Sequence, residues 1–292
     1  MPTQIRLVDD PIRRGVPPKG QLLKWIGNKH RMAAEIVSHF PREFGTYHEP
    51  FIGSGAVLAT VAPSKGRASD SFAPLITIWQ TLKDDPRQLV EWYAARWQRM
   101  ATGPKGDQYA AILAEYNRSP NGADLLFLCR ACYGGVVRFR RDGYMSTPCG
   151  IHTPIAPDAF ARRVSDWHNR IRNTVFEHVE YKSAMDRAVA GDLIYCDPPY
   201  SHTQSILYGA QDFRLEQLCD VIAQCKGRGV FVALSIDGTK KSGAKICDLP
   251  IPSGLFAREV FIDCGRSMLR RFQMNGESLE EEAVVDRLLL TY

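Results

Sequence analysis

The chain has 292 residues, which fits one large domain or two modest ones. Its net charge of +5 and pI near 8.7 permit a polyanionic partner without requiring one. No apolar run approaches the ~20 residues that a membrane span needs, and residues 1–20 contain no apolar signal-peptide core. We therefore expect a cytoplasmic protein that makes no membrane contact.

The eight cysteines are scattered and mostly stand in apolar segments, which is typical of core thiols. Cys129 and Cys132 form a C-x-x-C pair, but no second pair of ligands stands at a zinc-like spacing. We expect no metal site.

The first third of the chain alternates helix and strand. Residues 1–20 read as an irregular arm, and a helical pattern follows over 30–40. Lys29 stands near the start of that helix, where a positive charge opposes the helix dipole unless an anionic partner is present. A solvated lysine at a turn is the alternative.

A strand, a glycine turn and a helix are predicted over residues 47–59. Gly53 and Gly55 would let a ligand press against the backbone of that turn. A second strand is predicted to end at Asp70, where an acidic residue commonly holds ribose hydroxyls. A helix-capping role before Phe72 is equally consistent with the pattern.

The alternation with strands stops after a helix predicted over 72–82. Helical periods over 87–100, 108–116 and 123–132 predict an all-helical insertion. It leads into a hairpin signal at Asp142-Gly143, whose approach interleaves three arginines with aromatic residues. Arginine forks and aromatic planes together favour nucleic acid, and a solvated hairpin is the alternative. A further helix is predicted over 158–171.

The second half returns to α/β alternation. Strands are predicted over 175–181, 192–197 and 229–235, with helices over 183–189 and 214–226, a long polar loop over 201–212 and a turn-rich stretch over 236–253. Two last strands, over 256–263 and 283–291, have no helix between them. They are expected to pair as an antiparallel edge.

The stretch from Asp197 to Tyr200 reads Asp-Pro-Pro-Tyr and follows a buried strand directly. Two prolines stop the strand and leave nearby carbonyls, such as that of Pro198, able to accept from a ligand. A carboxylate, a carbonyl oxygen and an aromatic face suit a flat ring that carries an exocyclic amine. A surface turn after a core strand is the alternative.

Three motifs in this order resemble the Dam-like DNA adenine-N6 methyltransferases, the alpha group of the amino-methyltransferases. They are Lys24-Trp25-x-Gly27-x-Lys29, Glu49-Pro50-Phe51-x-Gly53-Ser54-Gly55 and Asp197-Pro198-Pro199-Tyr200. The segment from Cys132 to Arg138 also resembles that family. The resemblance implies an α/β fold: a Rossmann-like S-adenosylmethionine-dependent methyltransferase sheet with an antiparallel edge strand, formed by residues 1–84 and 174–292. A helical target-recognition insertion with a β-hairpin would occupy residues 85–173.

The resemblance also implies roles for matching residues. S-adenosylmethionine would be bound by Trp25, Lys29, Glu49, Phe51, Gly53, Gly55, Asp70 and Asp197. The adenine side of that cofactor pocket is expected near residues 182–184. Asp197, Pro198 and Tyr200 would act on a flipped adenine. Double-stranded DNA would be contacted by Lys24, Tyr133, Arg138, Arg140 and Pro148.

The implied reaction is methyl transfer from S-adenosylmethionine to the N6 amine of adenine in duplex DNA. Gly134 and Arg140 stand where the family usually has asparagine, so its best-known target, GATC, is not implied for this chain. Whether a cognate restriction endonuclease accompanies the protein stays open.

Four alternatives remain. A cytosine-N4 methyltransferase uses a similar platform, usually with serine in place of Asp197. A cytosine-C5 methyltransferase would need a Pro-Cys nucleophile, and Pro148-Cys149 is such a dipeptide. RNA could replace DNA as substrate, and the chain could be a non-catalytic DNA-binding subunit that has kept the fold.

Overall fold

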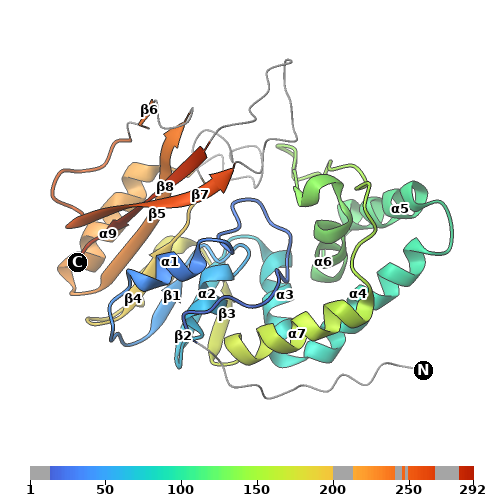
Figure 1. Cartoon of the computed structure of the whole chain (residues 1–292), viewed down its shortest axis with the longest axis horizontal. Helices are drawn as coiled ribbons and strands as arrows, with labels where there is room; N and C mark the ends of the chain where they lie inside the picture. Colours follow the sequence, from blue (N-terminus) through green and yellow to red (C-terminus); the bar gives the residue numbers. More distant parts are fainter. Residues whose placement is uncertain (1–13, 200–212, 241–244, 247–248, 267–282) are drawn as a thin grey trace.

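The structure is a computed structural model that describes residues 14–199, 213–240, 245–246, 249–266 and 283–292. A twisted, mostly parallel sheet forms the larger lobe, and a group of helices forms the other (Figure 1). The strands lie in the spatial order β3 (Thr174–His178), β2 (Gly66–Asp70), β1 (Tyr47–Glu49), β4 (Leu193–Cys196), β5 (Phe231–Lys240), β8 (Ala283–Leu290) and β7 (Arg258–Arg266).

The mixed α/β class predicted from the alternation is confirmed. The first five strands in this order are mutually parallel. The last strand of the chain, β8, runs antiparallel to both of its neighbours, β5 and β7. The predicted antiparallel pair therefore exists, with β8 inside the sheet and β7 at its edge.

Helices cover both faces of the sheet because the strands alternate apolar residues between two cores. On β4, Leu193 and Tyr195 belong to one core, and Ile194 and Cys196 belong to the other. The first core packs α1 (Ala33–Ser38), α2 (Ala56–Val61) and α3 (Ala73–Asp84). The second packs α8 (Tyr181–Met185) and α9 (Leu215–Gly227).

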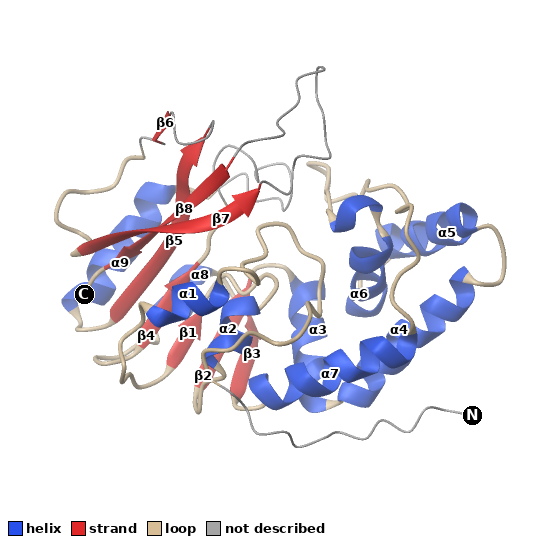
Figure 2. Cartoon of the chain, viewed as in Figure 1, coloured by secondary structure: helices blue, strands red, loops and turns tan. Residues whose placement is uncertain are grey.

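The helical group stands to one side of the sheet (Figure 2). It contains α4 (Pro86–Met100), α5 (Lys105–Arg118), α6 (Gly122–Ala131) and α7 (Pro157–Ile171), with a short 3-10 helix over Tyr133–Gly135. The Asp85 side chain accepts from the Gln88 N–H and starts α4 immediately after α3 ends. α7 returns to α2 and α3, so one apolar core continues from the helical group to this face of the sheet.

The stretch over 236–253 was predicted to be turn-rich, and for its first part this is wrong. β5 continues to Lys240, and β6 (Lys245–Ile246) pairs with its end. Asp237-Gly238, a dipeptide common in turns, instead lies at a bulge in the β5–β8 ladder between residues 237 and 239. A local turn preference therefore yields to pairing with β8.

The chain reverses at Asp142-Gly143, where Gly143 has φ +80°. Two isolated bridges, Phe139 to Met145 and Cys132 to Cys149, join the two arms in place of a continuous ladder. The Thr147 side chain adds to the backbone bonds between the arms: the Arg138 N–H donates to Thr147 Oγ1, and Thr147 Oγ1 donates to the Val136 carbonyl.

Candidate functional site

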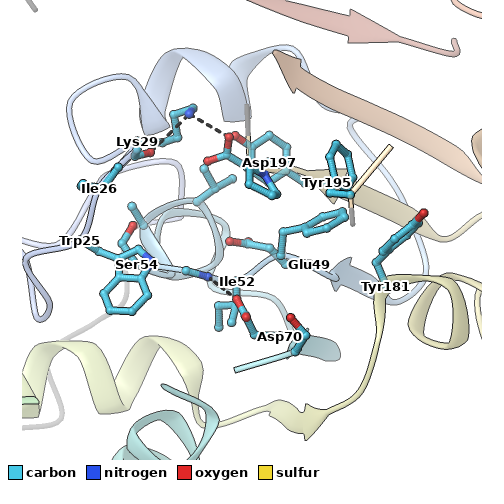
Figure 3. Close-up of a pocket in the computed structure, with 18 of the residues that line it drawn as sticks. Trp25, Ile26, Lys29, Glu49, Ile52, Ser54, Asp70, Tyr181, Tyr195 and Asp197 are labelled. Carbon is cyan, nitrogen blue, oxygen red and sulfur yellow. Dashed lines mark hydrogen bonds and ion pairs between the residues drawn. The ribbon is translucent and has the colours of Figure 1, made fainter. Parts of the chain in front are cut away.

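A cavity of about 430 Å³ opens at the carboxyl ends of β1, β2 and β4 (Figure 3). Parallel α/β sheets place their ligands at this edge. The residues predicted from the sequence that line it are Trp25, Lys29, Glu49, Phe51, Gly53, Asp70 and Asp197. Segments far apart in the chain thus converge on one cavity.

A buried ion-pair cluster forms one side of the cavity. Lys29 Nζ lies 2.8 Å from Asp197 Oδ1 and 3.5 Å from Asp286 Oδ2. The Lys29 side chain is only 5% exposed, and Asp197, at 19%, faces the cavity. The anionic partner that Lys29 requires is therefore present. Asp286 was not predicted, because a single aspartate on a distant strand carries no sequence signal.

Glu49 lies beside this cluster at the end of β1. The Tyr47 hydroxyl donates to Glu49 Oε2 at 2.6 Å. Burial raises the pKa of Glu49 to about 8, and the neighbouring Asp197 carboxylate also raises it, while the Tyr47 hydrogen bond acts in the opposite direction. Glu49 is therefore mostly neutral near pH 7, and Lys29 faces the two aspartates.

Asp70 lies on the opposite side of the cavity, at the end of β2 (Figure 3). Its carboxylate accepts from the Gly53 N–H at 3.3 Å and the Phe72 N–H at 3.1 Å. Burial raises the pKa of Asp70 to about 6, although these N–H donors lower it. Asp70 thus accepts a hydrogen bond from Phe72, the residue directly before α3. Its carboxyl also lines the cavity, where a ligand could reach it.

Aromatic rings form a third wall. Phe51 stacks on Tyr181 with ring centroids 5.2 Å apart, and Phe213 meets Phe51 edge-on at 6.0 Å. All three rings and Lys182 line the cavity, so part of the stretch expected near 182–184 is found there. Tyr181 and Phe213 escaped sequence reasoning because single aromatic residues outside a motif look like ordinary core residues.

The two predicted glycines have different surroundings. Gly53 lines the cavity with φ +44°, and a Cβ there would lie 3.3 Å from the Trp25 ring. Gly55 does not line it: with φ +62°, a Cβ would meet the Trp79 ring at 2.8 Å. Gly55 therefore makes room for packing, and its contact with a cofactor stays a prediction.

The Asp-Pro-Pro-Tyr platform is described only in part. Pro198 is buried, and Pro199 lines the cavity. Tyr200 lies outside the described residues. The roles predicted for Pro198 and Tyr200 remain predictions.

The predicted DNA-contacting residues gather at one loop. The Tyr133 N–H donates to the Pro148 carbonyl at 2.8 Å, and Arg138 and Arg140 are exposed nearby on the same reversal of the chain. Lys24 joins them, since its Cβ lies 3.0 Å from the position a Cβ would take at residue 135. The lysine next to the cavity-lining Trp25 thus neighbours the arginine-bearing loop.

Three other features were considered: the Pro148-Cys149 pair, a metal site and a membrane-spanning helix. Cys149 does not line the cavity, and burial raises the pKa of its thiol, the opposite of what a Pro-Cys nucleophile needs. Among the described residues, no group of three or more His, Cys, Asp or Glu side chains could hold a metal ion. No helix in the described part of the chain has the length and apolar character to cross a membrane.

The comparison with known families agrees with this geometry. The family model of the D12 class N6 adenine-specific DNA methyltransferases matches residues 25–244. The chain belongs to this family. The predicted resemblance is confirmed, as is the class of enzyme, an adenine-specific DNA methyltransferase; the cytosine and non-catalytic alternatives are not favoured.

Curated relatives include three with similar coverage. The type II methyltransferase M1.LlaDCHI of Lactococcus lactis subsp. cremoris is 26% identical over 230 residues, 73% of this chain and 79% of the relative. A DNA adenine methylase of Vibrio cholerae is 26% identical over 226 residues, with the same shares. The DNA adenine methylase of Escherichia coli (strain K12) is 28% identical over 204 residues, 67% of this chain and 71% of the relative.

Proposed function

We propose that the cavity binds S-adenosylmethionine together with an adenine extruded from duplex DNA, and that Asp197 holds the amine that becomes methylated. One observation carries this proposal: a single cavity joins Asp197 to Asp70 and to the aromatic wall at Phe51. The carboxylate predicted to act on the amine and the carboxylate predicted to hold a ribose thus face one space.

The residues of the cavity fit this cofactor. Its volume of about 430 Å³ lies in the range of small-molecule sites. Asp70 is a buried acceptor suited to ribose hydroxyls, and Phe51 and Tyr181 offer apolar ring faces to a purine. When bound, S-adenosylmethionine supplies an electrophilic methyl group on a sulfonium.

Asp197 would make the adenine amine a better nucleophile. That amine is weak because its lone pair is delocalised into the ring. A carboxylate that accepts one of its hydrogens, with the Pro198 carbonyl accepting the other, localises the lone pair on nitrogen. Methyl transfer would break the sulfur–carbon bond and form a nitrogen–carbon bond, and the nitrogen would then have one proton to lose. Asp197, which would accept a hydrogen bond from the amine, would be the group placed to receive that proton.

The surroundings would supply positioning and DNA contact. An adenine inside a duplex is out of reach, so it must be extruded, which costs a few kcal/mol. Stacking on Tyr200, about 1–3 kcal/mol, would offset much of this. Residues 85–173 would form the target-recognition domain, with Lys24, Arg138 and the loop around Tyr133 touching DNA.

The test is Asp197→Ala compared with Asp220→Ala, an exposed aspartate on α9 that does not line the cavity. Transfer of tritium from labelled S-adenosylmethionine to unmethylated duplex DNA should vanish in the first variant and persist in the second. Binding of cofactor and DNA should survive in both. Turnover retained by Asp197→Ala would refute the role given to this carboxylate.

The methylated nucleoside in the product DNA identifies the base on which the enzyme acts. Digestion of the labelled DNA to nucleosides should yield N6-methyladenosine in its deoxy form. Label in N4-methylcytosine would replace adenine by cytosine as the target. Label in neither nucleoside, from a wild-type protein that binds S-adenosylmethionine, would overturn the proposed reaction.

A further inference from the structure

The antiparallel strand β8 brings a second carboxylate to Lys29. Asp286 Oδ2 lies 3.5 Å from Lys29 Nζ, and the Asp286 side chain is only 10% exposed. In the sheet register, Asp286 pairs with Asp237 near the carboxyl end of β5. A parallel strand at this position would start at the opposite edge of the sheet, so the reversed direction of β8 puts its early residues beside the cavity.

We propose that Asp286 is a positioning residue for methyl transfer: by sharing the Lys29 ammonium, it sets how strongly that ammonium holds and polarises Asp197. This inference rests on the proposed function of Asp197. Neither the Dam-like motifs nor the cavity wall includes Asp286. Its printed ion pair is with Lys29, and the proposed positioning of Asp197 runs through that ammonium.

The geometry explains why a shared ammonium matters. Lys29 Nζ contacts Asp197 Oδ1 at 2.8 Å, a charge-assisted bond that orients this carboxylate and favours its ionised form. An ammonium devoted wholly to Asp197 would make the carboxylate a weaker acceptor for a substrate amine. Asp286 attracts the same ammonium at 3.5 Å and so weakens the interaction between Lys29 and Asp197.

Other titratable groups on the neighbouring strands lie near Lys29 and Asp197, and their charge states differ from that of a carboxylate near pH 7. Glu49 on β1 has a pKa raised to about 8, so it changes charge on the alkaline side. Tyr195 and Cys196 on β4 both interact with Asp197, and burial raises the pKa of each above its usual range, which keeps them neutral near pH 7. Among the described residues, Lys29 lies between Asp197 and Asp286 as the ion-pair partner of both.

The experiment measures the single-turnover methyl-transfer rate against pH, with saturating S-adenosylmethionine and unmethylated duplex DNA. Activity is lost as Asp197 becomes protonated, so the acidic limb reports its pKa in the complex. Asp286→Asn removes a negative charge and should move this limb to lower pH, with a maximal rate about 3-fold to 10-fold lower. Apparent affinity for cofactor and DNA should change little.

Lys29→Met should move the limb the other way, by about 1–3 pH units upward, since an opposite charge within bonding distance is lost. Lys29 also lines the cavity, so this variant is expected to bind cofactor less tightly as well. Adding Asp286→Asn to Lys29→Met should then return the limb part of the way downward. A purely structural role predicts no such pair of opposite shifts.

Asp192→Asn is the matched control. Asp192 precedes β4 at the opposite end from Asp197, is buried like Asp286, and lies 3.0 Å from His48 Nε2. This substitution should lower stability and leave the acidic limb in place.

An Asp286→Asn protein that folds, keeps the wild-type limb and keeps the wild-type maximal rate would overturn the inference. So would a limb that moves upward. Failure of the proposed function looks different, because the wild-type protein itself would then transfer no methyl group to DNA.

Discussion

Replacing Asp70 with asparagine tests the buried carboxyl at the cavity through its pH dependence. Burial raises the pKa of Asp70 to about 6, and the Gly53 and Phe72 N–H groups donate to it. In the unfolded chain an aspartate titrates near ~3.9. Between these values the folded state binds the extra proton, so the wild-type protein gains stability as the pH falls through about 6. The asparagine variant has no such proton to bind.

Linkage between these two pKa values gives about 1.3 kcal/mol of added wild-type stability between pH 7 and pH 5. Urea unfolding of wild type and Asp70→Asn at both pH values measures it. The informative quantity is the difference in unfolding free energy between the two proteins, because every other titrating group contributes to both. That difference should grow in favour of the wild type at pH 5.

A difference that is the same at pH 7 and pH 5, or that shrinks at pH 5, would refute the raised pKa. The same variant also reports on the ligand. If Asp70 accepts from ribose hydroxyls, calorimetric titration with S-adenosylmethionine at pH 7.5 should show an affinity about tenfold lower. Unchanged affinity would leave Asp70 with only its bonds to the backbone.

Three further predictions address packing, DNA reading and the aromatic wall. Gly55→Ala should lower the free energy of unfolding by about 1–3 kcal/mol, because the new Cβ meets the Trp79 ring at 2.8 Å with φ +62°. Gly143→Ala, with φ +80° and open space around it, should lower the free energy of unfolding by less when both variants are measured by thermal unfolding. Equal losses would contradict the packing argument. Arg138→Ala should relax sequence preference in methylation of a randomised duplex library; uniform weakening on every sequence would make it a phosphate contact. Tyr181→Ala should raise the Kd for S-adenosylmethionine in calorimetry while leaving DNA affinity in gel shifts unchanged, and an unaltered Kd would remove the ring from the cofactor site.

The spacing of apolar residues and glycines along the chain predicted the individual strands, the glycine turn and the helices. The strand that ends at Glu49, the glycine turn and the strand that ends at Asp70 all follow from short-range periodicity and backbone freedom. The helices over 86–171 were also predicted, although their ends differ by a few residues. Order along the chain was enough here because each element forms from neighbouring residues.

Contacts between distant residues could not be predicted in this way. Nothing near Lys29 indicates that Asp286 will lie 3.5 Å from its ammonium. The extension of β5 past the Asp237-Gly238 signal depends on the partner strand β8. The ring of Phe213 reaches Phe51 because both pack against the same core on one face of the sheet. Each of these depends on which strands pair, and this information is spread across the whole chain.

The position of β8 between β5 and β7 has a consequence for synthesis. A nascent chain on the ribosome completes β5 and β7 before it makes β8, so β5 waits with one flank unpaired and β7 waits without the strand that it pairs with in the described sheet. Bare flanks of this kind template intermolecular association. A stop codon shortly before residue 283 should therefore yield an aggregating product instead of a trimmed enzyme.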